Sequence, residues 1–180
     1  MKCTRYHYMK EVISFLSDQK YSSESVLEIS GKTKEWLSFF KRHTFAAFPE
    51  VDAHNLPYSD DSFDAVFCNQ VLEHVSKPWV CVDEFHRVLK SGGILILSSP
   101  FIYQEHNHPV DNWRFTPSGL GVLCENFSEI LLSHKGGNSK MVEHMIKNPS
   151  DRHSRRFRSL LAHEDENKIY YTISTIIAKK

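Results

Sequence analysis

The apolar positions of the sequence form stripes and short runs that predict alternating helices and strands. Across residues 8–16, apolar pairs recur every three or four positions, which is typical of an amphipathic helix. A short apolar run at 26–29, a run of strand formers at 63–70 and a continuous apolar run at 93–99 are typical of buried strands. Unbroken runs of this kind, separated by helical stretches, predict a mostly parallel sheet with helices on both faces.

Further elements follow from the same pattern and from helix start and stop signals. Pro78 suits the first position of a helix, and Gly92-Gly93 after Lys90 suits a left-handed end. We expect helices at 33–43, from Pro78 to Lys90 and at about 117–126, and strands near 129–133 and over 169–178. The expected fold is a shortened, doubly wound α/β domain.

Length and charge restrict the domain organisation and the class of partner. The 180 residues suit one domain spanning 1–180, with a charged, partly helical insertion at about 139–168. Lys plus Arg and Asp plus Glu both number 22, and this balance disfavours nucleic-acid binding or nucleic-acid methylation. The basic cluster at 152–158 is followed at once by acidic residues, so a solvated helix face is the favoured interpretation.

Cysteine spacing and hydropathy indicate a reducing compartment. The four cysteines are widely separated and form no C-x-x-C pair; they are Cys3, Cys68, Cys81 and Cys124. The N-terminus lacks the apolar stretch of a signal peptide, and no run approaches the roughly 18 apolar residues of a membrane span. We expect a cytoplasmic protein that does not span a membrane.

A segment at 30–33 reads SGKT, which is the end of a phosphate-binding loop motif. The glycine that begins that motif is replaced by Val26. Without this glycine the loop cannot wrap its amides around a phosphate. We therefore expect no nucleoside-triphosphate site here.

The most informative block is residues 52–101, which holds six short elements in succession: Asp52-Ala53, Leu56-Pro57-Tyr58, Ser62-Phe63-Asp64, Leu72-Glu73-His74-Val75, Arg87-Val88-Leu89-Lys90 and Gly92-Gly93. In these elements and their order the block resembles class I S-adenosylmethionine-dependent methyltransferases. The following segment, PFIYQEHNHPVDNWRFTPSGL at 100–120, is similar to the loop of one sub-group. The resemblance covers residues 26–138.

This resemblance implies a Rossmann-like fold that binds S-adenosyl-L-methionine and releases S-adenosyl-L-homocysteine. Ligands of such sheets bind at the carboxyl ends of the strands, near the switch in strand order. By similarity, the carboxylate of Asp52 would accept a hydrogen bond from the adenine amino group. The implied cofactor residues are Glu28, Ser30, Gly31, Asp52, Ala53, Asn69 and Gln70.

Two departures from the family pattern support an alternative. The turn after the first strand holds Ser30 and a single glycine, Gly31, where family members have Gly-x-Gly. Ala47 stands where an acidic residue normally holds the ribose, and Glu50 is a candidate replacement. The alternative is a catalytically silent relative that serves as a binding or assembly partner.

The chemistry expected is methyl transfer to a small or modest-sized acceptor, at oxygen or nitrogen rather than carbon. Such transfer depends chiefly on alignment, and a base helps when the acceptor carries a proton. The candidate catalytic residues are His74, His106 and Asp111, and the candidate acceptor-binding residues are Tyr103, His108, Trp113 and Arg114. Homo-oligomerisation is left open.

Each of these residues also has a purely structural interpretation. His74 could pack or cap the start of its helix, and Trp113, Arg114 and Phe115 could clamp the loop onto the sheet. Asn69 and Gln70 could be ordinary polar residues at a strand end. The H-x-H spacing followed by an aspartate is not specific for a metal, so we expect no metal site.

Overall fold

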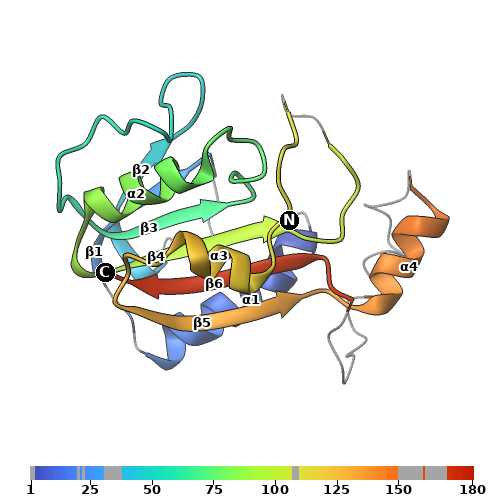
Figure 1. The fold of residues 1–180 in the computed structure, drawn as a ribbon. Coiled ribbons are helices and arrows are strands. Elements are labelled where there is room, and N and C mark those ends of the chain that lie inside the picture. The colour runs from blue at the N-terminus through green and yellow to red at the C-terminus, as the bar shows by residue number, and fades with distance from the viewer. Residues whose placement is uncertain are drawn as a thin grey trace.

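The computed structural model describes residues 3–19, 21, 23–30, 38–106, 110–149, 160 and 170–180. In the described chain, strands and helices alternate from residue 63 to residue 179 (Figure 1). The elements in order are α1 (Cys3–Asp18), β1 (Ser23–Ile29), β2 (Phe40–Ala46), β3 (Phe63–Asn69), α2 (Pro78–Val88), β4 (Leu89–Pro100), α3 (Pro117–Leu123), β5 (Glu129–Gly136), α4 (Ser139–Lys147) and β6 (Ile173–Lys179).

The six described strands form one mixed sheet in the order β2-β1-β3-β4-β6-β5. β1 pairs in parallel with both β2 and β3, and β3 pairs in parallel with β4. β6 runs antiparallel to its neighbours β4 and β5. From β1 the chain moves to one side to form β2, and later returns to the other side of β1 to form β3. This reversal confirms the doubly wound, mostly parallel sheet.

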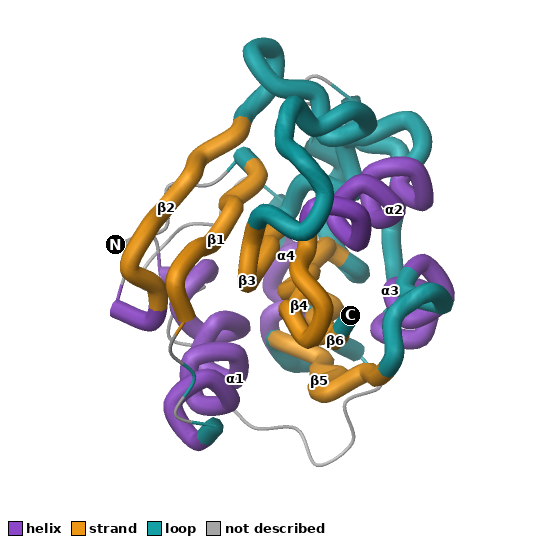
Figure 2. Tube along the Cα trace, turned by 90° about the vertical axis from the view of Figure 1, so that its left-hand side faces the viewer, coloured by secondary structure: helices purple, strands orange, loops and turns teal. Residues whose placement is uncertain are grey.

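Strand residues alternate between two apolar layers because successive side chains point to opposite faces. Phe67 of β3 packs in a cluster with Leu16 of α1. Its neighbour Val66 packs in another cluster with Phe85 of α2 and Leu120 of α3. Figure 2 shows α1 on one side of the sheet and α2 and α3 on the other. Each fully buried large side chain contributes roughly 1.5–3 kcal/mol to folding.

The junction between α2 and β4 differs in detail from the expected one. Pro78 does begin α2, but the helix ends at Val88, and Leu89 is already extended with φ −74° and ψ 138°. Leu89 pairs with Phe63 before an irregularity in the ladder between β3 and β4. This pairing begins the strand four residues before Gly93. The left-handed backbone expected nearby is confirmed at Gly92, where φ is 76°.

The helix predicted over 33–43 is wrong for residues 40–43, which belong to β2. Residues 33–37 lie outside the described chain. Phe40, expected on a helical face, is buried against Tyr21 and pairs with Ser23 of β1. The aromatic spacing therefore reflects a strand packed on the α1 side rather than an amphipathic helix.

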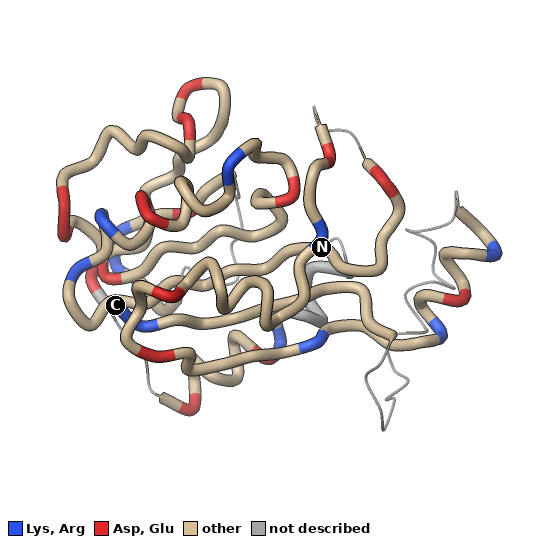
Figure 3. Tube along the Cα trace, in the orientation of Figure 1, with Lys and Arg blue, Asp and Glu red and all other residues tan. Residues whose placement is uncertain are grey.

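The C-terminal third follows the expected order with shifted ends. Thr116 caps α3 by accepting the Gly119 N–H at 2.9 Å, and Asn138 caps α4 by accepting the Met141 N–H at 2.9 Å. The segment expected to be an insertion, 139–168, begins with α4, and most of its remaining residues lie outside the described chain. The basic cluster at 152–158 lies outside the described residues. Along the described chain, acidic and basic residues are interspersed rather than segregated (Figure 3).

Candidate active site at the switch in strand order

A cavity of about 540 Å³ lies at the carboxyl ends of β1 and β3, where the strand order reverses. This is the position at which open α/β sheets bind their ligands. Four residues predicted from the sequence line this cavity although they are distant in the chain: Ser30, Asp52, Gln70 and His74. The other lining residues are Phe48, His54, Val71, Val75, Ser76, Val110 and Asn112.

The backbone is strained at both strand ends that open into the cavity. Ser30 follows β1 with φ 55°, and Gln70 follows β3 with φ 56°. Left-handed backbone is uncommon for residues other than glycine and costs of order 1–3 kcal/mol. Each residue is held by a backbone bond: the Ser30 N–H donates to Ala46 at 2.7 Å, and the Gln70 N–H donates to Ser98 at 2.9 Å. Such strain clusters at ligand sites.

Asp52 and His54 form a small network on the cavity wall. The Asp52 Oδ1 atom accepts from the His54 backbone N–H at 2.9 Å and lies 2.6 Å from His54 Nδ1. These bonds hold the pKa of Asp52 below its ordinary value, so the carboxylate is charged at neutral pH. His54 Nε2 accepts the Lys77 N–H at 3.3 Å, which fixes the proton on Nδ1.

The loop that carries Asp52 is held against α2 by the ion pair of Arg87 with Glu84. Arg87 donates to the carbonyl oxygens of Leu56 at 3.0 Å and Tyr58 at 2.8 Å. Its guanidinium also contacts Glu84 at 2.8 Å, and Glu84 accepts the Leu56 N–H at 2.7 Å. The matched R-V-L-K element therefore holds the loop in place through Arg87 and leaves Asp52 56 % exposed at the cavity.

Several predicted cofactor residues do not line this cavity. Glu28 is 1 % exposed within β1, and Ala53 is 8 % exposed within the apolar layer of α2. Asn69 is 4 % exposed, and its side chain accepts from the Ser98 hydroxyl. Glu50, the suggested replacement for an acidic residue, is exposed and absent from the lining. Gly31 lies outside the described residues.

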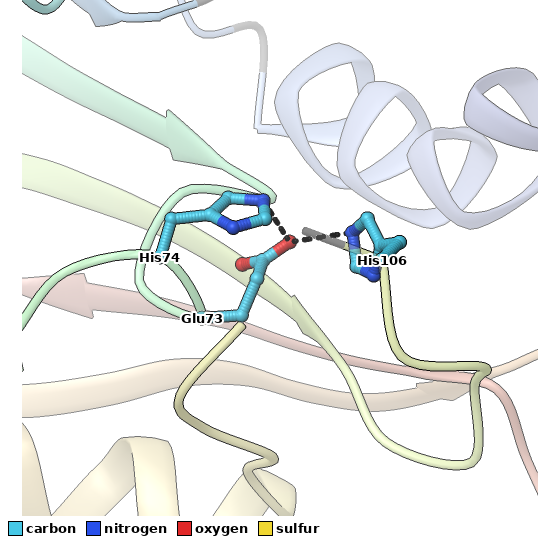
Figure 4. A group of neighbouring side chains, drawn as sticks. All are labelled: Glu73, His74 and His106. Carbon is cyan, nitrogen blue, oxygen red and sulfur yellow. Dashed lines mark ion pairs between the residues drawn. The ribbon is translucent and has the colours of Figure 1, made fainter. Parts of the chain in front are cut away.

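Beside the cavity, three side chains from two loops converge (Figure 4). Glu73 Oε1 lies 3.7 Å from His74 Nε2 and 3.9 Å from His106 Nε2. The His74 and His106 rings meet edge to face, with 5.1 Å between their centroids. The structure thus brings together two predicted catalytic histidines and adds Glu73, whose role the sequence analysis missed.

Both imidazoles are held through their Nδ1 atoms. His74 Nδ1 lies 2.5 Å from the carbonyl oxygen of Val110, which can only accept. His106 Nδ1 lies 3.1 Å from Asp111 Oδ2, and the His106 N–H donates to the same oxygen at 2.8 Å. Arg114 pairs with both oxygens of Asp111. Each Nδ1–H therefore donates to its supporting oxygen, and the Nε2 lone pairs are directed toward Glu73.

Burial and neighbouring charges determine the protonation of Glu73, His106 and Asp111. Glu73 is fully buried, which raises its pKa to about 8. Burial also lowers the pKa of His106, although the neighbouring Asp111 acts in the opposite direction. The Arg114 guanidinium holds the pKa of Asp111 far below its usual range. Glu73 and His106 are therefore mostly neutral at pH 7, and their contact is not a charged pair.

The loop from Phe101 to Thr116 is clamped onto the segment after β3. The Glu73 carbonyl oxygen accepts the N–H groups of Asn112 at 2.6 Å and Trp113 at 3.3 Å. The Trp113 indole donates to the Val75 carbonyl at 2.9 Å. Trp113 and Arg114 were predicted to bind the acceptor, but their polar groups are used within this clamp. These contacts favour the interpretation that Trp113 and Arg114 hold the loop in place.

Tyr103 lies on the other side of the same loop. Its ring is 5.5 Å from the ring of His106 and packs against Val142 and Met145 of α4. It lines a second cavity of about 320 Å³ with these apolar residues. Tyr103 therefore connects the histidine cluster to an apolar surface on α4. His108 lies outside the described residues.

Known proteins with a similar sequence are methyltransferases. A family model described as "Methyltransferase domain" matches residues 14–97. An uncharacterized methyltransferase of Mycolicibacterium vanbaalenii is 46% identical over 51 residues, which make up 28% of this chain and 20% of that protein. The chain thus matches about a fifth of the length of this curated relative.

Solved structures show the same fold at low sequence identity. The phosphoethanolamine N-methyltransferase 2 of Haemonchus contortus, in complex with S-adenosyl-L-methionine, has a TM-score of 0.58 at 12% identity, over 94% of this chain and 52% of that chain. The [4+2]-cyclase SpnF has a TM-score of 0.56 at 18% identity, over 94% of this chain and 80% of that chain.

In the part of the chain that the structure describes, no helix combines the length and apolar character needed to cross a membrane. The six matched sequence elements, the doubly wound sheet and the family model agree with one another. The comparisons favour a methyltransferase over the catalytically silent relative that the sequence left open. Over residues 14–97 the chain matches the methyltransferase-domain family model, and its sequence elements resemble those of class I S-adenosylmethionine-dependent methyltransferases.

Proposed function

We propose that this chain transfers a methyl group from S-adenosyl-L-methionine to an oxygen or nitrogen atom of a small acceptor. The cavity at the switch in strand order carries this proposal, because three residues that the resemblance assigns to the cofactor line it: Ser30, Asp52 and Gln70. They come from three loops, after β1, before β3 and after β3. Such convergence supports one ligand that contacts all three.

The residues of the cavity fit the chemical parts of this cofactor. A volume of about 540 Å³ lies within the range of roughly 300–1,000 Å³ of small-molecule sites. The charged Asp52 carboxylate suits a donor such as the adenine amino group or a ribose hydroxyl. Phe48 and Val71 give apolar area for a flat ring, and the left-handed turns at Ser30 and Gln70 bring backbone to the cavity wall.

The acceptor lies, in this proposal, on the side of His74. His74 lines the cavity and also belongs to the cluster with His106, so it joins the two regions. When bound, S-adenosyl-L-methionine supplies an electrophilic methyl group on a sulfonium. The protein aligns the acceptor with that methyl group, and such alignment accounts for much of the acceleration. The acceptor gives its proton to the cluster of His74 and His106. Asp111 orients the His106 ring in that cluster.

Calorimetric titration with S-adenosyl-L-homocysteine tests the cofactor site. We expect a micromolar Kd, about −8 kcal/mol. Asp52→Asn should weaken binding about 10-fold or more, because bonds to a charged group contribute roughly 1.5–3 kcal/mol. Glu50→Gln is the matched control, since Glu50 is exposed and does not line the cavity.

Two results would overturn the assignment. Equal weakening by both substitutions would remove Asp52 from the cofactor site. No binding by the unaltered protein at millimolar ligand would return the silent relative to first place. A cytoplasmic location and an acceptor of low molecular mass stay predictions, and the oligomeric state stays open.

A further inference from the structure

Three potential metal ligands converge at the border of the cavity. They are Glu73 Oε1, His74 Nε2 and His106 Nε2, and these ligand atoms all lie within 4.8 Å of one another (Figure 4). Glu73 is fully buried, and neither carboxylate oxygen has a hydrogen-bond partner among the described residues. Buried polar groups are nearly always paired, so this carboxyl group indicates a missing partner.

The geometry of the histidines defines what that partner is. Each Nδ1 faces a group that only accepts: the Val110 carbonyl for His74 and the Asp111 carboxylate for His106. A neutral imidazole protonated at Nδ1 presents a lone pair at Nε2. Two nitrogen lone pairs and a carboxyl oxygen of Glu73 therefore face one another, and a cation that displaces the Glu73 proton would satisfy all three.

The supporting contacts are those that metal-binding histidines use. A histidine ligand almost always donates its other ring N–H to a carboxylate or to a backbone carbonyl, which fixes its orientation. His106 has the first kind of support in Asp111, and His74 has the second in Val110. Asp111 is itself held by Arg114. The supporting contacts of the two histidine donors are thus already in place.

We propose that Glu73, His74 and His106 bind a divalent transition-metal cation, such as Zn²⁺ or Mn²⁺. Two imidazoles and one carboxylate form a donor set that such ions accept. Ligands at about 2.1 Å from a shared ion lie about 3.4 Å apart in tetrahedral geometry. The present separations of 3.7 Å and 3.9 Å therefore close by a few tenths of an ångström on binding.

The position of this site defines the acceptor that it would serve. His74 also lines the switch-point cavity, so the proposed ion lies at the border of the ligand space. This part of the inference rests on the proposed function. With the ion bound, His74 and His106 serve as its ligands instead of as bases, and a hydroxyl oxygen coordinated to the ion loses its proton to solvent more readily. That oxygen then forms the C–O bond with the methyl carbon, while the C–S bond breaks and its electron pair stays on sulfur.

The test uses the full chain without an affinity tag, after removal of metal by a chelator. Zn²⁺ and Mn²⁺ are titrated separately by calorimetry, and Co²⁺ is followed by its visible absorption. We expect one saturable equivalent of at least one ion. Glu73→Gln and His106→Ala should each weaken that binding at least 10-fold. His134→Gln, on β5, is the matched control and should leave it unchanged.

A second variant keeps the test decisive if a ligand substitution fails to fold. Asp111→Asn leaves all three ligands in place but weakens the support of His106 along with the pair to Arg114, and loss of such support typically lowers metal affinity by 10–100-fold. Circular dichroism checks that each variant is folded. Absence of saturable binding, or equal binding by Glu73→Gln, His106→Ala and His134→Gln, would overturn the metal site.

The same protein separates this inference from the proposed function. Binding of S-adenosyl-L-homocysteine without metal binding would leave the cofactor site intact and remove the ion. Metal binding without S-adenosyl-L-homocysteine binding would support the metal site and remove methyl transfer. With both present, added ion should raise the rate for a hydroxyl acceptor, and Glu73→Gln should abolish that increase.

Discussion

His106 and Asp111 contact each other twice: one carboxylate oxygen of Asp111 accepts the His106 backbone N–H at 2.8 Å and lies 3.1 Å from its Nδ1 atom. The side chain of Asp111 is 1 % exposed, although it carries a full charge. Its compensation is the paired guanidinium of Arg114. A buried charge of this kind is stable only while its partners are in place, so the loop depends on these three residues as a unit.

Arg114→Lys is therefore expected to loosen the loop. Lysine keeps the charge but cannot form the paired contact with both oxygens of Asp111. We expect the free energy of unfolding to fall by about 1–3 kcal/mol, measured by urea denaturation. Arg42→Lys on the exposed side of β2 is the control and should change it by less than about 0.5 kcal/mol. Equal effects of the two substitutions would show that the paired geometry contributes nothing.

Asp64 predicts a dependence of stability on pH. Burial opposes its charge, but bonds from Lys90 at 2.9 Å and from the Ser25 N–H and hydroxyl at 2.8 and 2.9 Å outweigh this and lower its pKa. A carboxyl group with a lowered folded-state pKa stabilises the protein above its unfolded pKa of about 3.9. That contribution is lost as the pH falls through the folded-state value.

The measurement compares Asp64→Asn with the unaltered protein by urea denaturation between pH 7 and pH 2. We expect the variant to be less stable by about 1–3 kcal/mol at pH 7. The difference should shrink below about pH 4, because both proteins are then uncharged at this position. A difference that stays constant down to pH 2 would contradict the assignment of the stabilisation to the charge of Asp64.

Gly92 and Gly93, which follow α2, differ in what restricts a side chain at each position. Gly92 has φ 76° and open space around it, whereas a Cβ on Gly93 would lie 2.8 Å from the Lys90 carbonyl oxygen and 3.0 Å from that of Asp64. Gly92→Asn should be nearly neutral because asparagine tolerates left-handed backbone. Gly93→Asn should cost about 1–3 kcal/mol through overpacking. Thermal unfolding of both variants checks this, and equal losses would disprove it.

The sequence predicts those parts of the fold in which local pattern and tertiary packing agree. The apolar runs of β3 and β4 are buried on both faces, so their sequences identify them directly. β2 is different because it lies at the edge of the sheet and only its terminal residues are buried. Phe40 belongs to it through pairing with β1, a long-range contact that spacing along the chain does not reveal.

The site divides in the same way. Asp52 and Gln70 follow from a motif and a strand end, and both line the cavity. Glu73 stands between Leu72 and His74 in the same motif, but nothing in its spacing shows that the carboxyl group is fully buried. The H-x-H spacing by itself predicts no metal site, whereas the converging donors come from two separate loops.

Ser30 gives a prediction in which stability and ligand affinity separate. Its φ of 55° costs of order 1–3 kcal/mol for a residue with a Cβ, and glycine adopts this backbone without strain. Ser30→Gly is thus expected to raise the melting temperature or leave it unchanged, despite the larger entropy of glycine in the unfolded chain. The same change removes a hydroxyl that lines the cavity.

If that hydroxyl binds the cofactor, Ser30→Gly should weaken S-adenosyl-L-homocysteine about 3- to 10-fold, as expected for a neutral hydrogen bond of roughly 0.5–1.5 kcal/mol. Ser30→Ala is the companion variant, because it lacks the hydroxyl but keeps the strain. Equal affinities of the two variants, with only Ser30→Gly more stable, would assign the loss to the hydroxyl. Tighter binding by Ser30→Gly alone would instead show that the Cβ obstructs the cofactor, because the missing glycine would then be the feature that limits affinity.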